Sequence, residues 1–424
     1  MQRRFPIGSW VCNNWSPTPE EMAAEWADLG FTLTLTPWFD DLPENHGLVH
    51  RLVDEANRHG MQVILCDRRT LSPRSNWSDF SQPIPLPANY KKQAAAAVNE
   101  YAAHPAVWGF YVEDEPLCGG LPAVAQACRI IEELTDQAEP YINLLPNHRI
   151  SPDRPEWTIE QQVGFDDYST YLDHVVDTTH VPVLSYDCYS QMSNVWGGTA
   201  QYFRNLASYQ SASIRNNVPF WTILLAIGHW MYRAPTPLEL SWQFYTSLAY
   251  GASGILYYYY RGGGIGHYGA AVDELGQKGQ LYYQMRRQHH HFQSQWEDRY
   301  RRCRIVRTSH WPKGPGGTVD FDGRGVVEHI QERSDVAWDG KTNPGLIVGE
   351  FMDDRERPHV LLANASASEH VAAVVNVRGR KVYMIEGPDK ETELANYQAR
   401  GSVGEGWFER FIMPGQALFV RVEK

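Results

Sequence analysis

The sequence has no long apolar run, few cysteines and a shortage of positive charge. No segment reaches the roughly 18 apolar residues that cross a membrane, so we expect no transmembrane helix. Arg3 and Arg4 are not followed by an apolar run of signal-peptide length, which favours a cytoplasmic location. Lysine and arginine number 38 against 50 aspartates and glutamates, a net charge of −12. Because nucleic acids and anionic membranes bind basic surfaces, this balance argues against both as partners.

The six cysteines are scattered, and none belongs to a CxxC pair. This spacing is neither a disulfide framework nor a zinc site, so we expect free thiols. Ligand sets for zinc or for an EF-hand calcium loop are missing as well. The histidines at 289–291 lie in a predicted helix, where consecutive side chains point in different directions and do not converge on one ion. We therefore predict no metal and no cofactor.

Aromatic residues are abundant instead. The chain has 15 Trp, 23 Tyr and 15 Phe among its 424 residues. This is more tryptophan than a core of this size needs. It favours a protein that stacks the flat faces of a ligand, with core packing as the alternative.

Short β-rich runs alternate with amphipathic helical stretches from residue 6 to about residue 302. The apolar runs are continuous, which is typical of parallel strands buried on both faces. Eight strand–helix units predict a (β/α)8 TIM barrel over residues 1–302, with a doubly wound sheet as the weaker alternative. The predicted strands are 6–11, 31–37, 61–67, 107–116, 141–147, 181–189, 219–227 and 254–260.

The pattern changes after Cys303. The runs GTVDF, GLIVGEFM, HVLLANAS, HVAAVVNV, KVYMIEG and QALFVRVE are typical of strands separated by Gly, Pro, Asn and Asp turns. No helical period lies between them. We therefore expect residues 303–424 to form a smaller all-β sandwich domain.

Three consecutive acids, Glu113, Asp114 and Glu115, end the predicted fourth strand. A barrel carries its chemistry at the carboxyl ends of its strands. Like charges this close raise the pKa of at least one carboxyl and can keep it protonated near neutral pH. Strand alternation predicts Glu113 and Glu115 on one side, with Glu113 toward the barrel mouth, and Asp114 on the other. The alternative is a solvated acidic loop, or an ion-pair cluster with Arg68 and Arg69.

Asp187 ends the predicted sixth strand and can face the same cavity from the opposite wall. A protonated acid beside an ionised carboxylate is the arrangement that hydrolyses a glycosidic bond. A helix cap or a structural hydrogen bond is the alternative for Asp187. Flat and polar side chains at the strand ends are the candidates for sugar binding. They are Trp10, Trp38, Asp67, Asp114, Asn147, His148, Tyr189, His229, Trp230 and Tyr258.

Four segments carry a family resemblance. They are HPAVWGFYVEDEP, LSYDCY, SWQFYTSLAYGASGILYYYY and FERFIMPGQALFVRVE. On these segments the sequence resembles the clan A glycoside hydrolases, (β/α)8 enzymes with an appended β domain. The resemblance implies a carbohydrate substrate, with Glu115 as the general acid/base. Clan A enzymes also carry a nucleophilic Glu at the end of the seventh strand, where TILLAIGHW has none; the nearest acid is Glu239 in the following helix. Asp187 or Glu113 is then the expected second carboxylate.

Three other functions stay open. The pair Asp114–Glu115 resembles that of the family 20 hexosaminidases, in which the acetamido group of the substrate attacks, the Asp orients it and the Glu is the acid. A lyase or metal-assisted hydrolase would use Asp67, Glu113 and Asp187 as ligands. A carbohydrate-binding protein on the same barrel would perform no chemistry.

Overall fold

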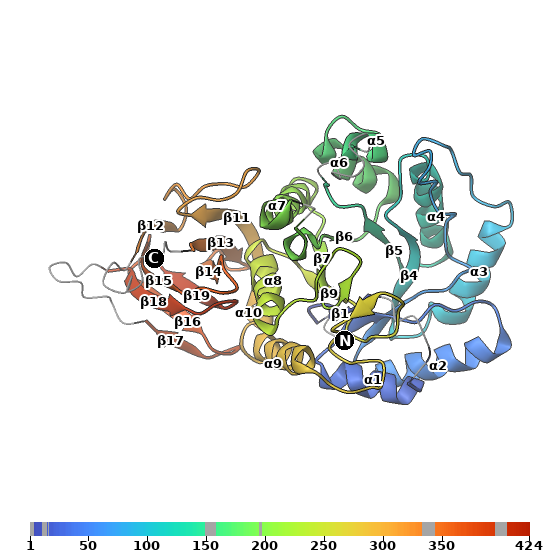
Figure 1. Ribbon diagram of the computed structural model, residues 1–424, viewed down its shortest axis with the longest axis horizontal. Helices are drawn as coiled ribbons and strands as arrows, with labels where there is room; N and C mark the ends of the chain where they lie inside the picture. The colour runs from blue at the N-terminus through green and yellow to red at the C-terminus, as the bar shows by residue number, and fades with distance from the viewer. Residues whose placement is uncertain are drawn as a thin grey trace. The chain divides into compact units, whose positions relative to one another are not determined.

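The computed structural model describes residues 4–10, 15, 17–148, 158–194, 197–332, 344–394 and 405–424. Eight parallel strands with intervening helices form a near-closed barrel, and antiparallel sheets follow toward the C-terminus (Figure 1). The predicted fold class is thereby confirmed. Within the described residues, no helix combines the length and apolarity that a membrane span requires.

The chain divides into two compact units. The first comprises Met1–Ala234 and Gly254–Arg286, and the second comprises Pro235–Ser253 and Arg287–Lys424. The expected domain boundary at residues 302 and 303 remains a prediction.

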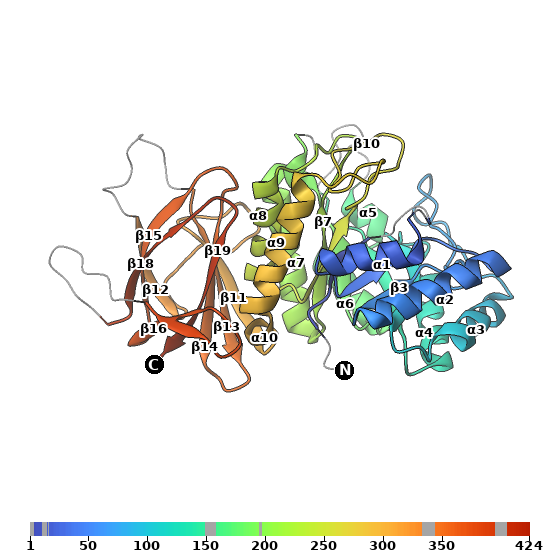
Figure 2. The same cartoon turned by 90° about the horizontal axis from the view of Figure 1, so that it is seen from below.

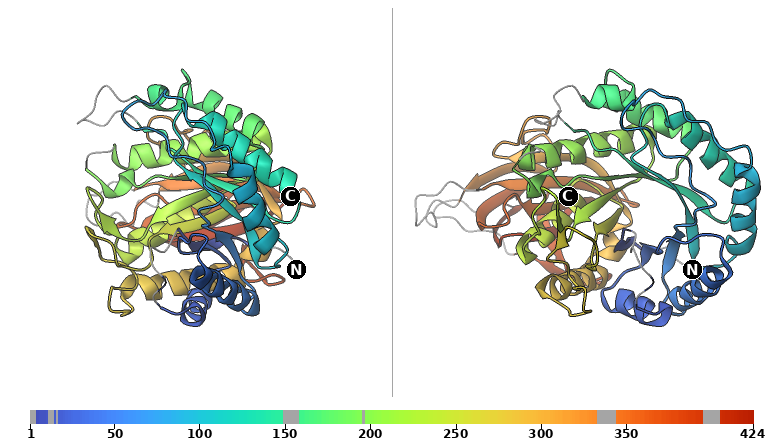
Figure 3. Two further views of the ribbon diagram at one scale, coloured as in Figure 1. Left: turned by 90° about the vertical axis from the view of Figure 1, so that its right-hand side faces the viewer. Right: turned by 45° about the vertical axis from the view of Figure 1, so that its right-hand side comes forward.

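The barrel belongs to the first unit. Its hydrogen-bonded strands follow the order β1-β9-β7-β6-β5-β4-β3-β2. The helices α2, α4 and α7 pack against β3, against β4 with β5, and against β7. In the right-hand view of Figure 3 the blue to green helices lie outside the strands. The strands are β1 (Ile7–Ser9), β2 (Leu33–Leu35), β3 (Gln62–Leu65), β4 (Val107–Asp114), β5 (Glu139–Leu144), β6 (Leu184–Asp187), β7 (Phe220–Leu225) and β9 (Gly254–Tyr258).

Helices alternate with these strands along the chain, as the sequence predicts. Several begin with a side-chain cap; the hydroxyl of Thr18, for example, accepts a hydrogen bond from the Glu21 amide. The helices are α1 (Pro19–Asp28), α2 (Pro43–Arg58), α3 (Tyr90–Tyr101), α4 (Leu121–Leu134), α5 (Ile159–Val163), α6 (Tyr168–Thr179), α7 (Gly198–Asn216), α8 (Pro237–Ala249), α9 (Gln280–Gln295) and α10 (Glu297–Tyr300).

Threonine side chains complete the contact between β1 and β2. The amide of Ile7 donates to Thr32 Oγ1 (2.9 Å), and the amide of Ser9 donates to Thr34 Oγ1 (3.1 Å). Gly8 lets the strands approach, because a Cβ at this position would lie 1.7 Å from the Leu33 carbonyl oxygen. The threonines of the second predicted strand thus replace part of a backbone ladder.

The second unit contains two antiparallel sheets that face each other (Figure 2). Their inner faces share one apolar core, to which Val360 and Val420 contribute from one sheet and Val375 and Phe408 from the other. The first sheet has the order β11-β13-β14-β19-β16-β17 and the second the order β12-β15-β18. The strands are β11 (Cys303–Trp311), β12 (Val327–Glu332), β13 (Leu346–Asp353), β14 (Pro358–Asn364), β15 (Val371–Val377), β16 (Lys381–Ile385), β17 (Glu391–Glu393), β18 (Trp407–Ile412) and β19 (Ala417–Glu423).

The sequence pattern missed some strands of this sandwich. β11, β12 and β17 were not expected, because they are short or rich in charged residues and half exposed. The predicted strand GTVDF is reduced to an isolated bridge at Asp320, in which the His310 amide donates to the Val319 carbonyl oxygen and the Phe321 amide donates to the His310 carbonyl oxygen.

Candidate active site

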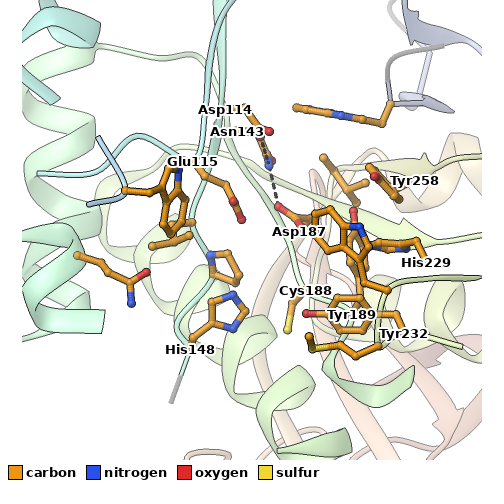
Figure 4. Close-up of a pocket in the computed structure, with 18 residues that line it drawn as sticks. Asp114, Glu115, Asn143, His148, Asp187, Cys188, Tyr189, His229, Tyr232 and Tyr258 are labelled. Carbon is orange, nitrogen blue, oxygen red and sulfur yellow. Dashed lines mark hydrogen bonds between the residues drawn. The ribbon is translucent and has the colours of Figure 1, made fainter. Parts of the chain in front are cut away.

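A cavity of about 360 Å³ lies at the carboxyl ends of the barrel strands. β4, β5, β6 and β9 bring residues to it, and so do the loops that follow β1, β3 and β7 (Figure 4). Acidic and amide groups meet here: Asp114, Glu115, Asn143 and Asp187. The aromatic walls are Trp10, Trp77, Tyr189, His229, Trp230, Tyr232 and Tyr258.

The register of β4 decides which acids face this cavity. Against its neighbours β4 carries two extra residues, Trp108 opposite β3 and Val112 opposite β5. Each extra residue shifts the in–out alternation of a strand by one position. Asp114 and Glu115 therefore line the cavity, whereas Glu113 lines a separate one. This differs from the expected simple alternation, which placed Glu113 toward the mouth and Asp114 away from it.

Glu115 occupies a strained backbone position. Its φ angle is 49°, and its amide donates to the Asn143 carbonyl oxygen (2.9 Å). Trp230, on the same cavity, has a φ angle of 47°. Left-handed conformations cost energy for residues other than glycine and persist where the surrounding structure enforces them, often at functional sites. Glu115 and Trp230 thus both start from a backbone conformation that few residues other than glycine adopt.

Asn143 connects two of the carboxylates. Its Nδ2 donates to Asp187 Oδ1 (2.8 Å) and to Asp114 Oδ1 (3.2 Å), and Figure 4 shows the amide between the two side chains. The Oδ1 of Asn143 accepts from Ser185 Oγ (3.2 Å), which fixes the orientation of the amide. β5 thus presents two donors to acids from β4 and β6.

The carboxyls differ in how well their ionised form is stabilised. Burial raises the pKa of Asp187, and the hydrogen bond from Asn143 partly offsets this rise. Burial also raises the pKa of Glu115, and the nearby Asp187 and Asp114 carboxylates raise it further. In the described part of the chain, no hydrogen bond reaches the Glu115 carboxyl. Both pKa values are therefore raised, and the ionised form is better stabilised at Asp187, which accepts from Asn143, than at Glu115.

Glu113 faces a second cavity of about 330 Å³ together with Trp38. Ser72 Oγ donates to Glu113 Oε2 (2.8 Å), and the Asp114 amide donates to Glu113 Oε1 (2.9 Å). Burial raises the pKa of Glu113 to about 7 despite these two hydrogen bonds. Of the two residues expected as the second carboxylate, the structure brings only Asp187 into the cavity of Glu115.

The remaining predicted site residues either line the main cavity or lie outside it. Burial lowers the pKa of His148 and of His229 to about 4, so both cavity histidines are neutral at pH 7. Asn147 lies on a neighbouring cavity with His148, and its amide donates to Asn205 Oδ1 (2.7 Å). The residues that line the main cavity are Trp10, Asp114, Glu115, His148, Asp187, Tyr189, His229, Trp230 and Tyr258; those that do not are Trp38, Asp67, Glu113 and Asn147.

Sequence reasoning missed some cavity residues. Asn143 could have been identified from the sequence, because it is a polar residue inside an apolar predicted strand. Trp77 and Tyr232 come from the loops after β3 and β8 (Gly228–His229), where no pattern marks a site.

The end of β7 supplies no acid to the cavity among the described residues. Ala226 and Ile227 follow the strand, and both are buried. Glu239 belongs to the capping box of α8, where its carboxylate accepts from the Thr236 amide (2.8 Å). Its task is to cap a helix of the second unit.

No group of three or more histidine, cysteine, aspartate or glutamate side chains in the described ranges has metal-binding geometry. The described cysteines are Cys66, Cys118, Cys128, Cys188 and Cys303, and all five are free thiols.

The comparisons with known proteins find similarity in three-dimensional structure. No protein-family model matches the chain, and no curated protein matches it. A GH42 β-galactosidase from G. stearothermophilus is similar with a TM-score of 0.57 and 11% identity, over 100% of this chain and 99% of the other. A glycoside hydrolase has a TM-score of 0.54 and 9% identity, over 99% and 93% of the two chains. A family 39 glycoside hydrolase from Bacteroides cellulosilyticus has a TM-score of 0.53 and 12% identity, over 99% and 81%. At these identities the likeness establishes a shared fold, a barrel with a β-rich domain.

Proposed function

We propose that the protein is a glycoside hydrolase in which Glu115 is the general acid and Asp187 the second carboxylate. One observation carries this proposal. Glu115, directly after β4, and Asp187, at the end of β6, both have raised pKa values and line one aromatic-walled cavity at the carboxyl ends of the barrel strands. Paired carboxyls of this kind cleave glycosidic bonds, and aromatic faces stack on sugar rings. The folds of the similar structures agree with this function.

The reaction uses Glu115 as the proton donor and the ionised form of Asp187. Glu115 gives its proton to the glycosidic oxygen as the bond to the anomeric carbon breaks. In one route Asp187 bonds to that carbon, and the deprotonated Glu115 then takes a proton from the water that hydrolyses the glycosyl ester. In the other route Asp187 takes a proton from the water that attacks the anomeric carbon directly. Asn143 keeps Asp187 ionised and oriented, while Trp10 and Trp230 hold the sugar rings.

Leaving-group dependence tests the role of Glu115. A screen of glycosides first identifies a cleaved substrate. Glu115→Gln should then lower kcat by roughly 10²- to 10⁴-fold on a sugar leaving group, because the glycosidic oxygen receives no proton. The loss should be much smaller for a dinitrophenyl glycoside, whose leaving group needs no acid. Glu133→Gln, on the exposed end of α4, is the matched control. Full activity of Glu115→Gln on the natural linkage would refute the assignment.

A substrate-assisted reaction is the second candidate, because Asp114 lines the same cavity beside Glu115. There the acetamido oxygen of the substrate would replace Asp187 as the attacking group, and Asp114 would orient the amide. A 2-deoxy-2-fluoro glycoside distinguishes the two reactions. Mass spectrometry of a trapped glycosyl ester on Asp187 supports attack by the enzyme. Turnover restricted to 2-acetamido sugars, with no trapped ester, supports the substrate-assisted route. Saccharide binding without any turnover identifies a binding protein.

A further inference from the structure

The second cavity lies at the same end of the barrel as the candidate active site. Trp38 follows β2, the segment Arg68–Arg74 follows β3, and Glu113 lies near the end of β4. The lining residues are Trp38, Arg68, Leu71, Ser72, Arg74, Tyr111 and Glu113. An indole face, two guanidinium groups, two hydroxyl groups and the Glu113 carboxyl are thus gathered around one space of about 330 Å³.

The second cavity adjoins the candidate active site. Tyr111 contacts Trp10 edge-on (5.4 Å between ring centroids) and Trp38 edge-on (5.0 Å). Trp10 lines the first cavity and Trp38 the second. Three consecutive residues at the end of β4 and directly after it also line both cavities, since Glu113 faces the second cavity while Asp114 and Glu115 face the first. A saccharide chain bound at Glu115 would therefore reach the second cavity with its neighbouring unit.

Polar groups of the second cavity lack partners in the protein. Arg68 and Arg74 are exposed, and in the described ranges neither guanidinium forms a hydrogen bond or an ion pair. The hydroxyl of Tyr111 is buried and, within the same ranges, has no hydrogen-bond partner. A buried hydroxyl without a partner is costly and indicates a group supplied from outside.

The arginines are not needed to hold Glu113. Its oxygens already accept from Ser72 Oγ and from the Asp114 amide. The neighbouring Arg69 shows the contrast, because its guanidinium is only 7% exposed and binds Asp67 at 2.7 Å. In a chain of net charge −12, two unpaired guanidinium groups on one cavity are a local exception.

We propose that the second cavity binds an acidic sugar unit of the saccharide cleaved at Glu115. Arg68 and Arg74 contact the carboxylate or sulfate group of this unit, Tyr111 donates to one of its oxygens, and Trp38 covers its ring. Guanidinium groups match the planar geometry of such anions, and the bonds are charge-assisted. The inference rests on the proposed function and adds to it a substrate class, an acidic oligo- or polysaccharide.

Arg74 also acts on the active-site acids through its charge, and the experiment must distinguish this effect from binding of the sugar. Its positive charge lowers the pKa of Glu113, Asp114 and Glu115. A change at Arg74 would therefore alter the active site even without a role in binding. The Arg68 charge is not among the causes of these shifts, so Arg68→Gln is the cleaner variant.

Binding is measured by calorimetry on the full chain carrying Glu115→Gln, so that turnover does not interfere. The first pair of probes is tetragalacturonate and its carboxyl-reduced counterpart, and the second pair is a sulfated tetrasaccharide and its desulfated form. One acidic probe should bind at least tenfold more tightly than its neutral partner. Arg68→Gln should weaken that probe by roughly tenfold to a hundredfold, since a hydrogen bond to a charged group is lost. The neutral probe should bind unchanged, and Arg68→Lys should restore part of the affinity.

Arg58→Gln is the matched control, because it removes the same charge at the end of α2, outside the cavity. Preference for the uronate or for the sulfated probe identifies the anionic group. Equal affinity for acidic and neutral probes, or an equal loss in Arg58→Gln, would overturn the acidic subsite while leaving the proposed hydrolase intact. Absence of cleavage of any glycoside would instead refute the hydrolase.

Discussion

Two sets of acids occupy neighbouring strand ends of one barrel, one around the buried Asp67 and the other formed by the half-buried Glu115 and Asp187, and their surroundings differ. Asp67 follows β3 and is fully buried; its carboxylate binds the Arg69 guanidinium through Nε (3.0 Å) and Nη2 (2.7 Å). Arg69 also binds Glu100 (2.9 Å) and Asp41 (3.1 Å). Glu115 and Asp187 have no such partner: among the described residues, no lysine or arginine lines their cavity.

This difference distinguishes Asp67, which stabilises the fold, from Glu115 and Asp187, which can take part in a reaction. Although burial acts to raise the pKa of Glu100, hydrogen bonds from Arg69 hold that pKa below its usual value. At Glu115 and Asp187 burial dominates, and the pKa values rise. A buried charge is destabilising unless it is paired. The cavity acids therefore have raised pKa values, whereas Glu100, which is paired with Arg69, has a lowered one.

The largest effect is expected where the ion pair is broken. Asp67→Asn should lower the free energy of unfolding by about 3–5 kcal/mol, because Arg69 stays buried with part of its charge uncompensated. Turnover per folded molecule should change by only a few-fold. Chemical denaturation measures the first quantity, and kcat at saturating substrate measures the second. Asp54→Asn on α2 is an exposed control. Unchanged stability together with lost activity would mean that Asp67 acts in the site after all.

At the active site, replacing an acid is expected to raise the free energy of unfolding at alkaline pH. Unfolded chains lose the Asp187 proton near pH 4, whereas the folded state keeps it to about pH 7, so the free energy of unfolding falls between these values. Asp187→Asn removes this dependence and should raise the free energy of unfolding at pH 8 by about 1–3 kcal/mol, with no gain at pH 4. It should also abolish most of the turnover. Urea unfolding at both pH values provides the measurement, and destabilisation at pH 8 would contradict it.

A smaller effect is expected from a substitution at Asn143, whose side chain donates to Asp187. Removal of its amide in Asn143→Ala deprives Asp187 of the hydrogen bond that favours the ionised form, which should raise the Asp187 pKa by about one unit. Because the reaction needs Asp187 ionised, the acidic limb of the kcat/KM profile should move by that amount to higher pH. Asn57→Ala on α2 is the control. An acidic limb that stays in place would show that another group sets it.

Parts of the fold follow from local pattern. Parallel strands buried on both faces have continuous apolar sequences, so the eight barrel strands could be predicted within a few residues. The edge strand β12 has two exposed polar residues after each buried apolar one, and this pattern lacks the alternation that predicts a strand. The extra residues of β4 left no sequence signal, since Trp108 and Val112 are ordinary strand residues. For this reason Asp114 was expected on the side away from Glu115, and Glu113 on the same side as Glu115.

The barrel, the sandwich and the acidic end of the fourth strand could be predicted from local sequence, because apolar periodicity and the order of strands and helices are local properties. The cavity that each acid lines depends on the folded structure. This placement depends on the bulges of β4, on the left-handed backbone at Glu115 and on the Asn143 amide between β4 and β6. These features arise from pairing between strands distant in sequence, and such pairing has no local signature.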